Sequence, residues 1–493
     1  MNRFYKIHPA IGIARVGIHP SAFFIGPERP GAPGIEIAAD NSESPVSQYK
    51  KEGLIKRQAA RFRVYEYAAD ETGNPTLIGE VSGDQAKIEW TVDLVNRKAA
   101  LDHSLAPGHP ATPRNTDVAD RNKLIIRNPQ PQSISGKGQR GIEFHGQFLT
   151  IRDVYLGELQ TDSAGRLIVL GGRGKSESDP PGADLPEFAN NDRWHDDVSD
   201  GPVTATVTLP GQVPIVVHQP AWVIVAPPDF APAIGGIVSL FDWTVQAAID
   251  GGMLKPDPQT SFRKHIQPVI QLAAGLRWVN NWTRWNSLLP LNWNALADPG
   301  AGSAALRQTV GARLTSPGLR SFIMPPFLKK YITDWVAGNF QSDLNAGDPV
   351  LPAPAALDRG ALEPCIGSNF FPGIEATVTI TDKDMYVEAG RLNPAVSTKV
   401  FPGCLTQYMA VPWQADFNDC DDGVWWPSQR PDIAMLDSGQ IPASQSSWAD
   451  PIADHQGMVD NAQRLGFIVP ARVGAETVFV EAERDSTLRR QAP

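Results

Sequence analysis

Polar and bulky apolar residues alternate repeatedly through the first 230 residues of the chain, and this alternation predicts strands. A period of two is typical of a strand that buries one face. The stretch 222–226 is apolar at every position and predicts a strand buried on both faces. The alternating segments are 61–67, 87–92, 166–170, 204–209 and 213–218. Together these segments predict a β-sandwich-like domain.

After Pro232 the spacing of apolar residues lengthens to that of helices. The helical stretches are 237–248, 262–276 and 326–336, and two later strands are expected at 376–380 and 476–481. We therefore predict an α+β, β-rich fold. Its two parts are a β-rich N-terminal domain at 1–232 and a mixed helical and irregular C-terminal domain at 233–493.

The composition is that of an ordinary globular protein. The chain has 493 residues, 42% hydrophobic and 20% charged, so well-buried cores are expected. A net charge of −10 without a polybasic run argues against nucleic acid or an anionic membrane as partner. No run of about 18 apolar residues suggests a membrane span, and no signal peptide is recognised. Three cysteines give no disulfide framework, so a cytoplasmic, reducing compartment is expected.

Two polar motifs predict turns and not ligand sites. The sequence 171–176, Gly-Gly-Arg-Gly-Lys-Ser, has Val169 where a phosphate-binding loop needs its first glycine. The acidic cluster of Asp192, Asp196, Asp197 and Asp200 lacks the spacing and terminal glutamate of a calcium loop. Side-chain-to-backbone hydrogen bonds in a structured turn explain such residues better.

Motifs of the common enzyme classes are absent from the sequence. The nine histidines are scattered, and no His-Glu-x-x-His or Cys-x-x-Cys pair occurs, so we expect no metal site. No Gly-x-Ser-x-Gly elbow or strand–helix Gly-x-Gly-x-x-Gly loop is present. A serine hydrolase and a classical nucleotide-binding oxidoreductase are therefore disfavoured.

The segment 411–420 carries the strongest candidate chemistry. It places Asp416 four residues before Cys420 in an apolar stretch that contains a tryptophan. A buried cysteine usually serves as a small hydrophobic residue, but a thiol with a base nearby can react. A disulfide between Cys404 and Cys420 is disfavoured by the expected compartment.

At these residues the chain resembles the lysine ε-oxidase-like and glycine oxidase-like family of amino-acid oxidases, which carry a cysteine tryptophylquinone. The resemblance follows the chain in order from residue 1 to about residue 470. The segments that carry it are 7–17, 194–203, 226–232, 363–365, 371–375, 409–416 and 425–427.

The resemblance implies oxidative deamination of an amino acid or primary amine with O2, which gives a carbonyl product, ammonia and hydrogen peroxide. In this family a tryptophan is oxygenated to a quinone and joined through sulfur to a cysteine. A flavoprotein partner carries out that maturation, and homo-oligomers are usual. The cofactor-site segments are expected within 365–470.

Residue by residue, the resemblance implies four roles. Cys420 matches the cross-linking cysteine, and Asp416 matches the carboxylate needed to form the cofactor. Cys365 matches a position that lines the substrate site, and Phe241 matches the aromatic residue that gates it.

The chain departs from the family pattern at three positions. Ala462, in the sequence Met458 to Phe467, stands where the quinone-forming tryptophan is expected. Ile433 stands at the position of the active-site histidine, and Cys404 at that of an aspartate. Trp448, 28 residues after Cys420, is the nearest free tryptophan that could take the place of residue 462.

Two hypotheses follow. The first is an amino-acid oxidase whose cysteine tryptophylquinone joins Cys420 to another tryptophan, with Trp448 as the candidate. The second is a family member without the cofactor, acting as a binding or scaffold protein or through thiol and carboxylate chemistry. In that case Cys404 and Cys420 could interact as a redox pair or as metal ligands.

Overall fold

The computed structural model describes most of the chain. Cys420, Phe371, Trp425 and Trp426 lie outside the described residues. The described ranges are 2–71, 74–104, 111–217, 219–280, 283–315, 323–347, 350–367, 373–419, 428–436, 445–474 and 476–490.

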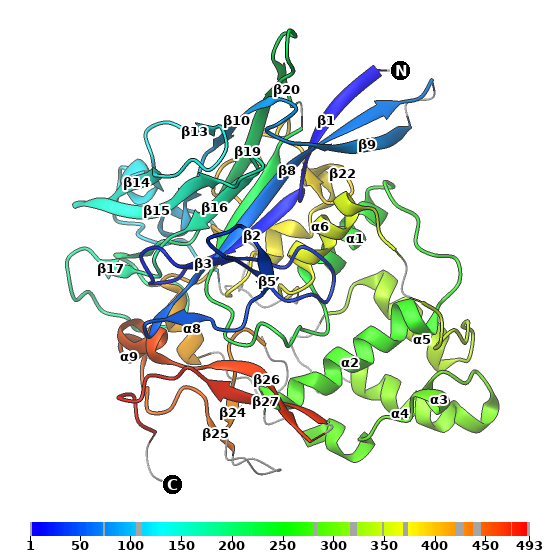
Figure 1. The fold of residues 1–493 in the computed structure, drawn as a ribbon. Coiled ribbons are helices and arrows are strands. Elements are labelled where there is room, and N and C mark those ends of the chain that lie inside the picture. The colour runs from blue at the N-terminus through cyan, green and yellow to red at the C-terminus, as the bar shows by residue number, and fades with distance from the viewer. Residues whose placement is uncertain are drawn as a thin grey trace.

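A large mixed sheet forms the N-terminal half (Figure 1). Its longest strand, β8 (Arg57–Ala69), pairs antiparallel with β1 (Asn2–His8) and β9 (Pro75–Val81), and parallel with β3 (Phe23–Ile25). Its neighbour β2 (Ile11–Arg15) runs parallel to β21 (Ala221–Ala226), and both strands are buried at every residue. The apolar run at 222–226 therefore lies in the interior, as predicted.

Seventeen strands among the described residues belong to this one hydrogen-bonded network. In β10 (Lys87–Val92) the side chains alternate, with Ile88 and Trp90 buried and Lys87 and Glu89 exposed. The other strands are β4 (Ile35–Ile37), β5 (Glu43–Pro45), β11 (Val95–Asn96), β12 (Ile126–Arg127), β13 (Gln132–Ser135), β14 (Ile142–Phe148), β15 (Ile151–Thr161), β16 (Leu167–Gly171), β19 (Ser199–Thr208) and β20 (Ile215–Val216). Two short hairpins accompany the sheet, β6 (Lys50–Lys51) with β7 (Leu54–Ile55) and β17 (Ser176–Ser178) with β18 (Trp194–Asp196).

Helices occupy the middle of the chain and lie beside the sheet (Figure 1). Helix α1 (Leu240–Asp250) begins at a capping box in which Ser239 and Asp242 bond each other's backbone N–H groups. Helix α6 (Ala353–Leu362) packs against β2. The remaining helices are the π-helical turn η3 (Phe262–Ile266), α2 (Gln267–Gly275), α3 (Trp293–Leu296), α4 (Ala304–Thr315) and α5 (Pro326–Val336).

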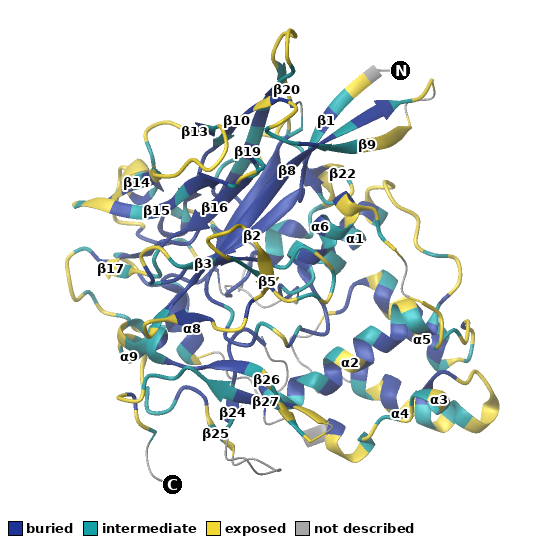
Figure 2. Cartoon of the chain, viewed as in Figure 1, coloured by how far each residue is buried: buried dark blue, intermediate teal, exposed yellow. Residues whose placement is uncertain are grey.

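The C-terminal segment lies below the large sheet in the view of Figure 1. Helix α8 (Trp413–Asp419) packs against α9 (His455–Asn461), which is followed by the single turn η8 (Ala462–Arg464). Three small hairpins complete the chain: β22 (Tyr386–Glu388) with β23 (Arg391–Leu392), β24 (Ile433–Met435) with β25 (Gln445–Ser447), and β26 (Phe467–Val473) with β27 (Glu476–Ala482). Figure 2 shows that the buried residues are concentrated in the central strands and in the helix faces that meet them.

The predicted fold class is confirmed: the chain is α+β and rich in strands. The predicted strand at 376–380 is wrong, because Thr377–Ile380 forms the short helix α7. Its buried residues, Thr377 and Ile380, are three positions apart and so share one side of a helical turn. Four alternating residues are too few to separate the two patterns. In the part of the chain that the structure describes, no helix is long and apolar enough to cross a membrane.

Candidate functional site

Arg15, at the end of β2, brings together segments that are far apart in the sequence. Its Nη1 donates to the carbonyl oxygen of Pro227 at 2.9 Å. Its Nη2 donates to Oε1 of Glu375 at 2.6 Å and lies 3.4 Å from Sγ of Cys365. Charge-assisted hydrogen bonds of this length are strong and fix the geometry of both partners. Arg15 therefore holds Cys365 and Glu375 against the sheet.

This Arg15–Glu375–Cys365 cluster is buried, with each residue no more than 3% exposed. Burial raises the pKa of the Cys365 thiol well above its usual range, and the nearby Glu375 adds to this effect. Cys365 is therefore a neutral thiol at physiological pH, suited to lining a site and not to nucleophilic attack.

A small pocket lies beside this cluster. Asp229 and Tyr49 lie on its wall, together with groups from the sheet and from the turn after α6. Asp229 accepts a hydrogen bond from the backbone N–H of Ala231 at 2.9 Å. Burial raises the pKa of this carboxyl group, although the charge of Arg15 opposes the change. The full lining is Arg15, Phe24, Pro27, Gly34, Tyr49, Gln58, Asp229, Pro232, Ala361, Pro364 and Cys365.

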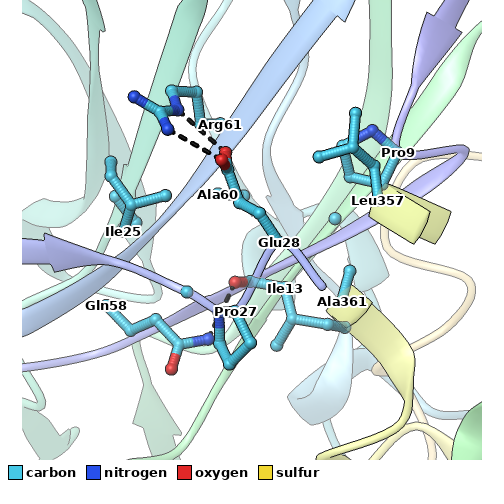
Figure 3. Close-up of a pocket in the computed structure, with 13 residues that line it drawn as sticks. Pro9, Ile13, Ile25, Pro27, Glu28, Gln58, Ala60, Arg61, Leu357 and Ala361 are labelled. Carbon is cyan, nitrogen blue, oxygen red and sulfur yellow. Dashed lines mark hydrogen bonds and ion pairs between the residues drawn. The ribbon is translucent and has the colours of Figure 1, made fainter. Parts of the chain in front are cut away.

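A second small hollow adjoins the first and shares Pro27, Gln58 and Ala361 with it (Figure 3). Glu28 lies on its wall and bonds the guanidinium groups of Arg61 and Arg63. Burial raises the pKa of Glu28, but the two arginines outweigh burial and lower it to about 2. Because these charges neutralise one another, this hollow is a structural feature of the sheet.

Helix α8 carries a carboxyl group in an unusual state. Asp416 is fully buried, and neither of its oxygens has a hydrogen-bond partner among the described residues. Burial raises its pKa well above the usual range, although Arg430 and Lys98 act in the opposite direction. The folded protein therefore favours the neutral form of Asp416 more than the unfolded chain does.

The neighbouring acid Asp196 is fully bonded, in contrast to Asp416. Its Oδ2 binds the buried Lys98 ammonium and accepts the backbone N–H of Trp413 at 3.0 Å. This hydrogen bond satisfies an orphan N–H at the start of α8 and orients the helix.

An aromatic cluster connects the pocket to α8. Asp229 lies on the pocket wall, and the next residue, Phe230, packs against Phe417 of α8 with ring centroids 6.0 Å apart. Phe230 also contacts the rings of Trp448 and Phe467, each at 4.9 Å. The pocket and the Asp416 helix thus belong to one packed unit.

Trp448 lies between the end of α8 and the segment that follows Ala462. Its Nε1 donates to the carbonyl oxygen of Gly466 at 2.8 Å. The guanidinium of Arg430 lies 5.8 Å from its ring and also donates to the carbonyl oxygen of Phe417 at 2.6 Å. The ring is fully buried. Ala462 is also buried and follows α9 directly, the helix that packs on α8.

The structure brings several predicted site residues together. The backbone N–H of Leu240 donates to the carbonyl oxygen of Cys365 at 2.9 Å, so Phe241 at the start of α1 lies beside that cysteine's backbone. The Arg359 guanidinium covers the Phe241 ring at 5.5 Å. Cys404 is a buried free thiol, whereas the geometry of Cys420 lies outside the described residues.

Sequence reasoning gave no role to Arg15, Glu375, Asp229 or Tyr49. The first three lie within segments that carry the family resemblance, which was the available signal. Tyr49 lies in none of them. Its place on the pocket wall depends on the hairpin of β6 and β7 and on stacking with Phe467 at 5.0 Å.

The fold is similar to that of solved structures of known proteins. The chain superposes on crystal structures of the L-Lys epsilon-oxidase from Marinomonas mediterranea, including that of its Schiff base intermediate with L-Lys, with TM-scores of 0.79 to 0.81. The sequence identity is 22%, and the match covers 98% of this chain and 95% of that one. The fold is therefore that of an L-Lys epsilon-oxidase.

Sequence comparison identifies the family to which the chain belongs. Residues 8–225 match the L-Lysine epsilon oxidase N-terminal family, and residues 320–438 match the L-lysine epsilon oxidase C-terminal domain family. The L-lysine 6-oxidase of Marinomonas mediterranea is 26% identical, over 84% of this chain and 71% of that protein. The chain belongs to the L-lysine epsilon oxidase family.

Proposed function

We propose that this protein oxidatively deaminates an amino acid or another primary amine with O2, giving a carbonyl product, ammonia and hydrogen peroxide. The observation that carries the proposal is the buried carboxyl group of Asp416, which has a raised pKa and no hydrogen-bond partner among the described residues. Such a group destabilises the fold, so its presence in a member of this family supports a chemical role.

The residues present fit the family's cysteine tryptophylquinone in part. Asp416 fits the carboxyl group that builds it, but Ala462 offers no ring at the matching position. Trp448 is the tryptophan that approaches both the end of α8 and the segment after residue 462. We therefore assign Cys420 and Trp448 as the residues that hold the cofactor, which when present supplies an electrophilic carbonyl and accepts the electrons of the amine.

The chain's own residues have separate tasks in this proposal. In its ionised form Asp416 would take up a proton released when the indole and the thiol are joined, with the flavoprotein partner accepting the two electrons of that oxidation. Burial raises the pKa of this carboxyl group and so makes its carboxylate a stronger base. Cys365 and Phe241 shape the substrate site, and the dry Arg15–Glu375 pair keeps that wall rigid. A flavoprotein maturation partner and a homo-oligomeric assembly are part of the same proposal.

A second function is favoured by one observation, the alanine at position 462. In this alternative the chain keeps the scaffold and the pocket but forms no quinone, and it binds an amine or amino acid without oxidising it. The complete burial of Trp448 supports this alternative, because a quinone must be reached by substrate.

Intact-protein mass separates the two functions. The chain is co-expressed with the family's flavoprotein partner, and its mass, visible absorbance and peroxide release with L-lysine and simple amines are measured. Quinone formation adds two oxygen atoms to the mass and gives visible absorbance, whereas an unmodified mass overturns the oxidase proposal. Trp448→Phe is the matched variant: retention of full modification in it would exclude Trp448 as the partner of Cys420.

A further inference from the structure

The glycine-rich loop 171–176, which begins at the end of β16, encloses a carboxyl group of the protein itself. The backbone N–H of Lys175 donates to Oδ2 of Asp197 at 3.1 Å, and the backbone N–H of Arg173 donates to the same carboxyl group. Gly172 permits this approach, because a Cβ atom at its position would collide with the Asp197 carboxyl group. Converging backbone N–H groups are typical of loops that bind anions. In this loop Asp197 occupies the place of an external anion.

The same loop binds a side chain in the first turn of α8. Nε2 of Gln414 donates to the carbonyl oxygen of Gly174 at 3.2 Å. The Ser176 hydroxyl donates to Oε1 of Gln414 at 2.6 Å. Gln414 is buried, so an unbonded amide there would cost free energy. Both polar atoms of this amide are therefore satisfied by one loop, which connects α8 to the end of a strand of the large sheet.

The turn that contains Asp197 reaches α8 by two routes. Asp196 accepts the backbone N–H of Trp413 directly, at 3.0 Å. Asp197 acts through the loop, which in turn bonds Gln414. A helix of seven residues is too short to be stable by itself. These contacts therefore determine where α8 lies.

The environment of Asp416 depends on the position of α8. Asp416 lies two residues after Gln414 and is fully buried. Neither of its oxygens has a hydrogen-bond partner among the described residues, so no bond of its own carboxyl group fixes its place. Burial is the largest cause of its raised pKa. A displacement of α8 that admits water would therefore bring the pKa of Asp416 back toward its ordinary value.

We propose that Gln414 and Asp197 are positioning residues for Asp416: through the loop 171–176 they hold α8 against the large sheet and keep water from the Asp416 carboxyl group. The proposal rests on the proposed function for the chemistry of Asp416, but the contacts that hold α8 require no cofactor. It also gives the glycine-rich motif a role, because the acceptor of its N–H groups lies inside the protein.

Urea unfolding of the full-length chain, expressed without the flavoprotein, tests the positioning role. The quantity measured is the free energy of unfolding of Asp416→Asn minus that of the same protein with Asp416. This difference should rise between pH 4.5 and pH 7.5, because a raised pKa in the folded state lowers stability as the pH rises. The titration of Asp197 occurs in both proteins and cancels. In a Gln414→Met background we expect the rise to fall to less than about half, since water then reaches Asp416.

Further variants separate positioning from a general loss of stability. Asp197→Ala leaves the N–H groups of the loop without their acceptor and should reduce the rise as Gln414→Met does. The matched control is Gln456→Met on α9, which removes an exposed amide that donates to Asp460 of the same helix at 3.0 Å and should keep the full rise. If Gln414 is merely structural, its loss lowers stability equally at each pH and leaves the rise intact. That result would overturn the proposal, as would the absence of a rise in the natural background. If Gln414→Met does not fold, Ser176→Ala decides in its place.

The outcome is separable from that of the oxidase proposal. After co-expression with the flavoprotein, the modified fraction of Gln414→Met should be several-fold lower than that of the natural chain. An unmodified natural chain rejects the oxidase, and the pH series still decides on the positioning role. A modified natural chain whose Gln414→Met variant keeps the full rise and full modification supports the oxidase and rejects the positioning role.

Discussion

Burying a carboxyl group without a partner costs a folded protein free energy, and the size of the cost depends on whether the group is charged. Burial raises the pKa of Asp416, which favours the neutral form of its carboxyl group. Burying the neutral form costs less free energy than burying the charged form. The cost still rises with pH, since the unfolded chain releases this proton at a lower pH than the folded chain does. The protonation state of Asp416 therefore affects both the stability of the fold and the proposed chemistry.

Asp416→Asn should stabilise the protein at neutral pH and abolish cofactor formation. Because the folded pKa lies above the unfolded value, the carboxyl group penalises folding increasingly as pH rises above about 4. The free energy of unfolding of the variant, measured by urea titration, should therefore rise relative to that of the natural protein between pH 4 and pH 8, by on the order of 1 kcal/mol. Intact mass after co-expression with the flavoprotein should show no modification; a fully modified variant would remove Asp416 from the mechanism.

Asp197 gives a second pH dependence, with a defined window. Burial and the charge of Asp196 raise its pKa to about 7, while backbone N–H groups of Arg173 and Lys175 oppose the shift. The neutral form of Asp197 makes its full contribution to the free energy of unfolding below pH 4. This contribution is lost as the pH rises toward 7. Urea unfolding of Asp197→Asn at pH 4.5, 6 and 7.5 should show a stability curve flatter than that of the natural chain, by at most about 4 kcal/mol over the window. Parallel curves for the two proteins would contradict the assignment.

At the scale of elements, the position of α8 depends on a buried ion pair. Lys98 and Asp196 are both fully buried, and Asp196 also receives the first N–H of α8. Lys98→Met leaves the Asp196 charge without its cation, and such losses cost about 3–5 kcal/mol. The control Lys87→Met removes an ammonium whose side chain is 66% exposed and should change stability by less than about 0.5 kcal/mol.

Equal effects of the two lysine variants on the urea midpoint would show that the pair does not hold α8. If the ion pair does hold α8, the double variant Lys98→Met with Asp196→Asn should recover part of the stability lost in Lys98→Met, because the second substitution removes the unpaired charge.

The elements were predictable from the sequence where the pattern is local. The strands at 61–67, 87–92 and 222–226 lie within β8, β10 and β21, because alternation of bulky residues and a continuous apolar run are both patterns of neighbouring residues. The segment 262–276 does form helix, but it begins with the π-helical turn η3 before α2, a change of hydrogen bonding that apolar spacing does not encode. The helix at 377–380 was missed because four residues are too short to carry a period.

The candidate site could be predicted only in part. Asp416 was a candidate from its spacing to Cys420 and Cys365 from the family resemblance, but Arg15 and Glu375 are 360 residues apart, and no local pattern pairs them. Whether a carboxyl group has partners also depends on the complete packing. The bonded state of Asp196 and the unpartnered state of Asp416 could not be distinguished from the sequence, since both are acids in apolar surroundings.

At the scale of the whole molecule, one hydrophobic core runs from the first strand to the last turns. It includes Tyr5 and Leu488, and it joins the two predicted domains 1–232 and 233–493 without a break. Strand β2 packs on α6, and Tyr49 stacks on Phe467. Each half therefore completes the burial of the other.

This continuity leads to the expectation that the chain unfolds in one transition. Near-ultraviolet and far-ultraviolet circular dichroism should give the same midpoint, because loss of the C-terminal half exposes the inner face of the sheet. The fragment 1–232, expressed alone, should fail to give a native spectrum, since it lacks Glu375 for Arg15 and Phe467 for Tyr49. Without Glu375, Arg15 loses a charge-assisted hydrogen bond, and such a bond contributes about 1.5–3 kcal/mol. Two separated transitions, or a 1–232 fragment that melts cooperatively near the midpoint of the full chain, would instead show that the halves are independent folding units.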